Sequence, residues 1–119
     1  MSSEKERTVD MNVLELSKAA SLNVITLPCP EREVNGAYIG DLLSWVMGRA
    51  TEDNAWITIM SNANIVAVAT LADVSCIILA EGVTPDEGVA KTAEAKGVNI
   101  LSSDKSAYEI AKKLSELNI

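Results

Sequence analysis

The sequence contains no histidine and no phenylalanine, and only two tryptophans, two tyrosines and two cysteines among its 119 residues. Without histidine, the chain has no imidazole for acid–base catalysis, for phosphotransfer or for holding a metal ion. Basic residues are also few. The chain has 10 Lys and Arg and 17 Asp and Glu, which gives a formal net charge of −7. This charge repels phosphate backbones and the few aromatic rings offer little stacking surface, so we expect no nucleic-acid binding.

No apolar run reaches the roughly 18 residues that a membrane span requires, and the first ten residues lack the hydrophobic stretch of a secretory signal. We therefore expect no membrane association. Cys29 and Cys76 allow at most one disulfide, and we expect two free thiols in a reducing, cytoplasmic compartment. We expect neither a metal nor another cofactor.

With 48% hydrophobic residues, the chain is long enough for one domain with a core. We expect a flexible N-terminal segment at residues 1–11 and a single domain at 12–119. Short apolar runs predict strands, and helical spacing or capping residues predict helices between them. The expected strands are 24–27, 34–39, 55–60, 75–80 and 98–101, and the expected helices follow caps at Asn12, Asp41, Ser61 or Asn62, Thr84 and 102–104.

This alternation predicts an α/β fold of three layers, a mostly parallel sheet of about five strands with helices on both faces. Thr84, Pro85 and Glu87 form the pattern of a capping box with proline at the first helical position. The helix at 65–72 is apolar nearly all round, so it must be covered on most sides. The run 24–27 is read as a buried strand.

Because ligands of open α/β sheets collect at the carboxyl ends of the strands, the residues after each strand are the first candidates. The turn 61–64 precedes a helix and can either bind an anion through free N–H groups or simply cap that helix. Glu81 and the acidic pair Asp86 and Glu87 can bind a cation or transfer protons, although helix capping also explains the last two. Tyr38 can present its ring or hydroxyl at the same edge. The acidic residues beside this edge argue against a phosphate-rich ligand.

Cys29 lies between two prolines just after a strand, and two interpretations remain open. It is either the nucleophile of a phosphocarrier or thiol enzyme, or a partly buried inert thiol, because Glu31 and Glu33 oppose the positive surroundings that activate a cysteine. Cys76 lies among isoleucines and is expected in the core.

From Val34 onward, the order of segments resembles the DRTGG domain, which occurs in HPr serine kinases, phosphotransacetylases and some pyrophosphatases. The resemblance rests on 34–37, the apolar strands 56–59 and 77–79, Gly82, Pro85, Gly97 and 100–102, and covers about 85 residues. The chain departs from both signature motifs: 61–63 replaces Gly-Asp-Arg, and 80–82 replaces Thr-Gly-Gly with only the last glycine kept. The resemblance implies a regulatory domain without catalysis, and the chain has no phosphate-binding P-loop.

We therefore expect a non-catalytic regulatory module that senses a ligand or binds a partner and forms a homodimer. The apolar helix at 65–72 motivates the dimer, since so small a domain leaves it partly uncovered. No catalytic residue is predicted. The alternatives are a phosphocarrier or thiol enzyme using Cys29, and a scaffold subunit without a small ligand. The residues expected to bind a small-molecule effector are Tyr38, Ser61, Asn62, Asn64, Glu81 and Gly82.

Overall fold

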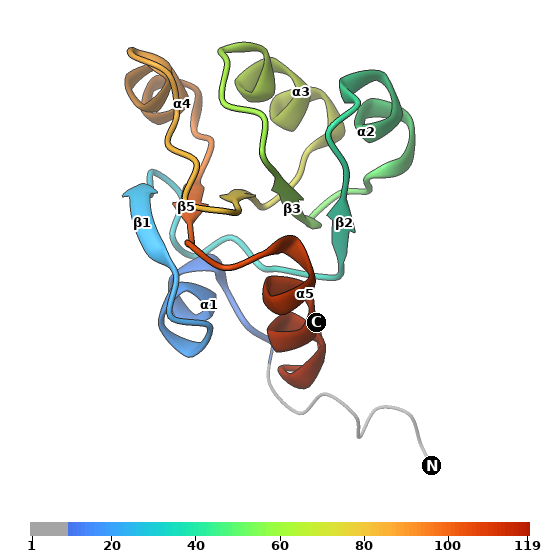
Figure 1. The fold of residues 1–119 in the computed structure, drawn as a ribbon. Helices are drawn as coiled ribbons and strands as arrows, with labels where there is room; N and C mark the ends of the chain where they lie inside the picture. Colours follow the sequence, from blue (N-terminus) through green and yellow to red (C-terminus); the bar gives the residue numbers. More distant parts are fainter. Residues whose placement is uncertain (1–9) are drawn as a thin grey trace.

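The computed structural model describes residues 10–119 (Figure 1), so most of the flexible segment expected at 1–11 lies outside the described residues. Five strands form one sheet in the order β1-β5-β4-β3-β2, in which β1 is antiparallel to β5 and the other neighbours are parallel. The elements are α1 Val13–Ala19, β1 Asn23–Thr26, β2 Ala37–Ile39, α2 Leu43–Arg49, β3 Ala55–Thr58, α3 Asn64–Ala72, β4 Cys76–Leu79, α4 Val89–Lys96, β5 Ile100–Ser102 and α5 Ala107–Glu116. The predicted mostly parallel α/β sheet is confirmed.

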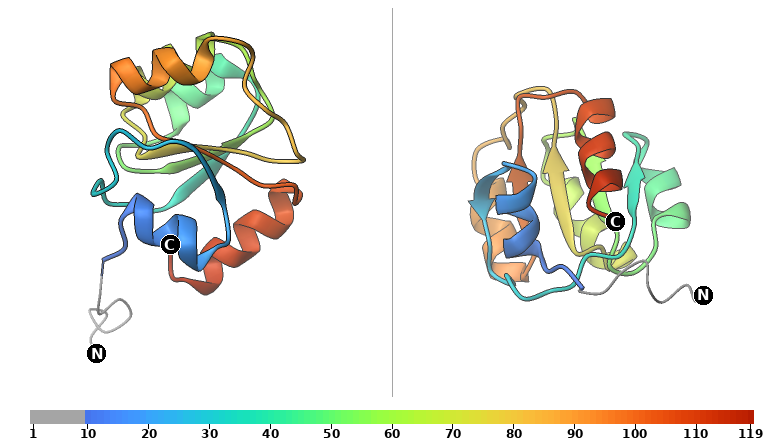
Figure 2. Two further views of the ribbon diagram at one scale, coloured as in Figure 1. Left: turned by 90° about the vertical axis from the view of Figure 1, so that its left-hand side faces the viewer. Right: turned by 90° about the horizontal axis from the view of Figure 1, so that it is seen from below.

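The sheet lies between two helix layers, with α2, α3 and α4 on one face and α1 and α5 on the other (Figure 2). Adjacent side chains of a strand point to opposite faces. Trp56 and Ile77 therefore contribute to the core beneath α2, α3 and α4, while Ile57 and Ile78 contribute to the core beneath α1 and α5. All residues of β3 and β4 are buried, which explains why these strands read as unbroken apolar runs.

The first strand is not the buried strand that its sequence indicates. In β1, Asn23 and Val24 are exposed, and Val24 keeps 49% of its surface. The reason is topological, because β1 is an edge strand that pairs only with β5, so one side of it has no neighbour.

The predicted starts of α4 and α5 are also wrong. Helix α4 begins at Val89 after Gly88, which adopts φ 85°, and not at Thr84. Helix α5 begins after Ser106, whose hydroxyl accepts from the Glu109 N–H, and not after 102–104. By contrast, Asn12 caps α1 as predicted, because its side chain accepts from Glu15 N.

At the amino-terminal edge of the parallel strands, one arginine joins two turns. The Nη2 of Arg32 lies 3.1 Å from Asp53 Oδ1 and 2.7 Å from Asp73 Oδ1, and it donates to the Asp73 carbonyl at 2.6 Å. Partial burial lowers the pKa of Arg32, but its hydrogen bonds and ion pairs with Asp73 and Asp53 outweigh burial and raise it overall. These acidic residues therefore stabilise the edge opposite the expected ligand site.

Candidate functional site

Backbone hydrogen bonds join the segments that follow β3, β4 and β5 at the carboxyl edge of the sheet. Ala80 N donates to the Thr58 carbonyl at 3.0 Å, which keeps the segments after β3 and β4 side by side. Glu81 N and Gly82 N donate to the carbonyls of Lys105 and Ser103, at 2.8 and 2.9 Å. The topology therefore brings the predicted segments 61–64 and 81–82 to one edge of the sheet.

Asp41 organises this edge and does not cap α2 as its position in the sequence suggests. Its Oδ1 accepts from Thr58 Oγ1 at 2.8 Å and from Ile59 N at 3.0 Å. The N-cap position of α2 is instead Leu42, which makes no side-chain capping bond. The carboxylate of Asp41 is thus used to hold the turn that follows β3.

Ser61 and Asn62 are engaged within the chain. The Ser61 hydroxyl donates to Asp86 Oδ1 at 2.8 Å, and Asp86 N donates back to the Ser61 carbonyl at 2.9 Å. Asn62 Oδ1 accepts from Asn64 N at 2.8 Å, but the N-cap position of α3 is Ala63, so the predicted cap at Ser61 or Asn62 is wrong. The Ser61–Asp86 pair draws residues 84–87 towards the end of β3, which explains why α4 cannot begin at Thr84.

Tyr38 lies in β2 opposite Trp56, one residue before the strand ends, and is half-buried against the core beneath α2, α3 and α4. A Cβ atom at Gly40 would lie only 2.8 Å from Tyr38 Cε2, so glycine at this position makes room for the ring. Asn64 and Glu81 are exposed, and Gly82 forms the turn after β4. Tyr38 therefore packs against the core beneath the helices, whereas Asn64 and Glu81 are exposed.

Two consecutive residues with positive φ follow β4. Glu81 has φ 61° and Gly82 has φ 74°. Only glycine adopts this conformation without a steric cost, which is about 1–2 kcal/mol for other residues. Glu81 stands where the Thr-Gly-Gly motif of the resembled family has its first glycine, so a residue with a side chain takes a conformation that suits glycine.

We predict that Glu81→Gly raises the free energy of unfolding by about 0.5–1 kcal/mol, because the relief of strain exceeds the added entropy of the unfolded chain. Urea denaturation measures this difference. Lys91→Gly, in the interior of α4, is the control and is expected to lower stability by about 1 kcal/mol. If Glu81→Gly were less stable than the wild-type chain, the backbone at residue 81 would not be strained.

Cys29 is half-buried among neutral groups. Its backbone N–H donates to Asn99 Oδ1 at 2.9 Å, and its Sγ donates to the Gly97 carbonyl at 3.5 Å. Cys76 is fully buried, as predicted. Within residues 10–119, no group of three or more His, Cys, Asp or Glu residues is arranged to hold a metal ion. The helices of this part of the chain are all too short or too polar to cross a membrane.

Sequence reasoning missed three residues that shape this edge, namely Asp41 as its anchor, Thr58 as the partner of Asp41 and Asp86 as the partner of Ser61. Each forms a side-chain bond to a residue at least 17 positions away in the sequence. These contacts could not be predicted because aspartate before a helix is typical of a cap, so the positions of Asp41 and Asp86 indicate helix starts.

Comparison with known proteins confirms the resemblance seen in the sequence. The family model of the DRTGG domain matches residues 30–117. A similar fold occurs in the crystal structure of the CBS and DRTGG domains of the regulatory region of Clostridium perfringens pyrophosphatase, complexed with its activator diadenosine tetraphosphate. The TM-score is 0.69 at 14% identity, over 83% of this chain and 44% of the other. No curated protein matches the sequence. The chain belongs to the DRTGG domain family.

Proposed function

We propose that this chain is a non-catalytic regulatory module that works in the cytoplasm as a homodimer and responds to a small-molecule effector or a partner protein. Its family membership supports a regulatory role, since the similar DRTGG domain of the Clostridium perfringens enzyme belongs to a regulatory region crystallised with an activator. This chain spans 44% of that region. Two unpaired cysteines agree with a reducing compartment.

The observation that supports the homodimer is a set of exposed large apolar side chains on β2, on α2 with its N-cap, and just after β3. We call it the β2–α2 surface and define it by Ile39, Leu42, Trp45 and Ile59. These side chains keep 49%, 58%, 52% and 47% of their surface exposed. We infer that these side chains contribute to one interaction surface, since exposed apolar patches mark interaction sites.

From the sequence, a dimer is expected because the apolar helix at 65–72 needs cover, but the structure changes this reason. Helix α3 packs between α2 and α4 of the same chain, with Ile65, Val66, Val68 and Ala69 buried, so most of its apolar surface is covered and only Leu71 among its large apolar side chains stays exposed. The β2–α2 surface replaces it as the reason for a dimer. Strand β2 is an edge of the sheet and pairs only with β3, which leaves Ile39 beside an open edge.

A second copy of the chain suits this surface because a two-fold interface brings the same residues of both copies together. Two chains of net charge −7 repel each other unless the contact itself is poor in carboxylates. The β2–α2 surface meets this condition. The Asp41 carboxylate accepts two hydrogen bonds within the chain, and the Arg49 guanidinium lies 3.7 Å from the centre of the Trp45 ring.

Size-exclusion chromatography with light scattering tests the homodimer, and we predict twice the 12.7 kDa mass of the chain at micromolar concentration. Ile39→Lys places a charge in the interface and is expected to raise the dissociation constant at least about 100-fold. Val24→Lys is the matched control, because Val24 is equally exposed on the opposite edge strand and its variant should remain a dimer. A monomeric wild-type chain, or equal dissociation of both variants, would reject the β2–α2 surface as a dimer interface.

A further inference from the structure

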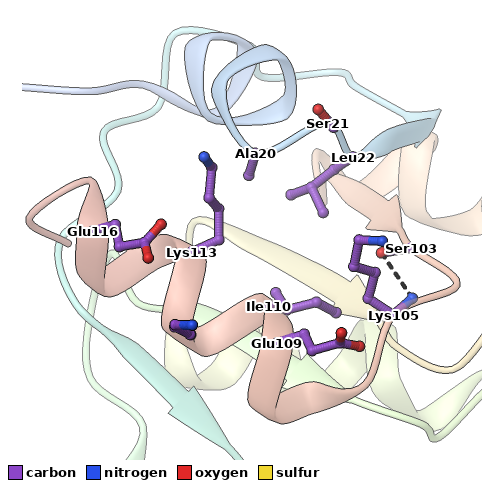
Figure 3. A pocket seen from close by; sticks show the side chains of 10 residues that line it. Ala20, Ser21, Leu22, Ser103, Lys105, Glu109, Ile110, Lys113 and Glu116 are labelled. Carbon is purple, nitrogen blue, oxygen red and sulfur yellow. Dashed lines mark hydrogen bonds between the residues drawn. The ribbon is translucent and has the colours of Figure 1, made fainter.

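A cavity of about 370 Å³ lies between α5 and the turn that joins α1 to β1, on the face of the sheet opposite α3 (Figure 3). Its volume lies within the range of about 300–1,000 Å³ that is typical of small-molecule sites. Leu22 and Ile110 are buried beside it and provide an apolar wall. None of the residues expected to bind a ligand from the sequence lines it.

The cavity collects positive charge in an acidic protein. Three lysines, Lys105, Lys112 and Lys113, contribute to its lining, although the whole chain has only 10 basic residues. Among residues 10–119 none of these ammonium groups has a carboxylate partner, and both ion pairs that the structure describes belong to Arg32. Figure 3 shows Lys113 extending from α5 towards Ala20 at the end of α1.

Two glutamates also line the cavity, but one of them is already engaged. Glu109 Oε1 accepts from the backbone N–H of Ser106 at 3.2 Å and from its hydroxyl at 3.3 Å, as part of the capping box of α5. Glu116 lies beyond Lys113, one turn nearer the end of the helix. The lysines are therefore only partly offset by the acidic residues around them.

Serine hydroxyls complete the polar lining. Ser103 is buried, and its Oγ accepts from Lys105 N at 3.0 Å, which leaves the hydroxyl proton to be donated elsewhere. Ser21, which also lines the cavity, follows the C-cap of α1 and adopts φ 56°, the left-handed conformation in which helices commonly end. Hydroxyl donors beside lysine ammonium groups suit the oxygens of a phosphate group.

We propose that this cavity binds a small phosphate monoester, with Lys105 and Lys113 neutralising the phosphate and the apolar wall of Leu22 and Ile110 contacting its organic part. The proposal deepens the regulatory function above, since it names the class of effector. The position is suited to regulation, because the same loop that lines the cavity through Ser103 and Lys105 also bonds to Glu81 and Gly82 at the sheet edge.

Nuclear magnetic resonance of the ¹⁵N-labelled full chain tests the proposal, with glucose 6-phosphate as the probe and glucose as its neutral control. At about 0.15 M NaCl, where long-range charge effects are screened, we expect saturable shifts of Ser21, Leu22, Ser103, Lys105 and Lys113 with glucose 6-phosphate and none with glucose. Inorganic phosphate should shift the same signals more weakly, and a response to citrate equal to that of glucose 6-phosphate would overturn the assignment to phosphate.

The double variant Lys105→Gln/Lys113→Gln is expected to bind glucose 6-phosphate at least about tenfold more weakly. The matched control, Lys91→Gln/Lys96→Gln, removes the same charge from α4 and should change the affinity less than about twofold. Equal weakening by both pairs, saturable shifts confined to 61–64 and 81–82, or no saturation up to about 10 mM would each overturn the proposal. Light scattering of the same samples reports the dimer separately, so the failure of one proposal is distinguishable from the failure of the other.

Discussion

Replacing Asn99 with alanine is expected to lower the free energy of unfolding by about 3–5 kcal/mol, a large part of the about 5–15 kcal/mol that stabilises a typical domain. Asn99 is 1% exposed and makes three hydrogen bonds to the backbone. Its Oδ1 accepts from Cys29 N at 2.9 Å, and its Nδ2 donates to the carbonyls of Cys29 and Ser75 at 2.8 and 3.0 Å. Alanine leaves these groups without partners and opens a small cavity.

The effect is large because Asn99 connects segments that are far apart in the chain. It lies just before β5 and fixes the loop after β1 at Cys29 as well as the start of β4 at Ser75. Each lost bond contributes about 1 kcal/mol, and leaving a buried backbone group unsatisfied costs about 1–3 kcal/mol more.

Urea denaturation followed by circular dichroism measures the change, and Asn64→Ala serves as the control because Asn64 is exposed at the first turn of α3. The control is expected to change stability by less than about 0.5 kcal/mol. A variant Asn99→Ala that stays within about 1 kcal/mol of the wild-type chain would show that water replaces the lost bonds.

The sequence predicts the middle of the sheet well because burial there leaves a strong local signal. Residues 55–58 and 76–79 are buried on both faces, so only apolar residues and small polar ones fit them. The edge strand β1 gives the same apolar signal without being buried, since the pattern of Val24 and Ile25 does not reveal how many neighbours a strand has. Pairing is a property of the whole fold.

The same capping-box pattern occurs twice in the sequence, and local sequence alone does not show which of the two caps a helix. Thr84 and Glu87 have the spacing of a capping box, as do Ser106 and Glu109, yet only the second pair forms one. Asp86 lies inside the first pattern and bonds to Ser61, 25 residues earlier, so a tertiary contact overrides the local preference. The residue numbers alone do not show that Ser61 and Asp86 meet.

The cavity beside α5 could not be predicted for a related reason. The charges after Leu101 balance in the sequence, so the segment shows no basic character. In the structure, Glu109 is engaged in the cap with Ser106, and Ser21 lines the same cavity as Lys113. The three lysines of this segment therefore line one cavity together with Glu109, which is engaged in the cap of α5, and Glu116.

The second large prediction concerns stability in alkaline solution. Burial raises the pKa of the Cys76 thiol to about 12, while the hydrogen bond with Ser75 and the positive charge of Arg32 lower it only in part. In the unfolded chain a cysteine has a pKa of about 8.5, so above that value the unfolded state loses a proton that the folded state retains. The contribution of the neutral thiol is therefore fully present below about pH 8.5 and is lost as the pH rises towards 12.

We expect the wild-type chain to lose about 3 kcal/mol of stability between pH 8.5 and pH 11 through this group alone, at about 1.4 kcal/mol per pH unit. Lysines and tyrosines titrate in the same range, but Cys76→Ala retains all of them, so the difference between the two chains isolates the thiol. At pH 7 the variant should be less stable by about 1 kcal/mol because it loses the sulfur contacts. Urea denaturation under reducing conditions should then show the order reversing at about pH 9, because the thiolate that stabilises the unfolded wild-type chain cannot form in the variant, and by pH 11 the variant should be the more stable chain by about 2 kcal/mol. A stability difference that stays constant from pH 7 to pH 11 would mean that the folded protein accommodates the Cys76 thiolate.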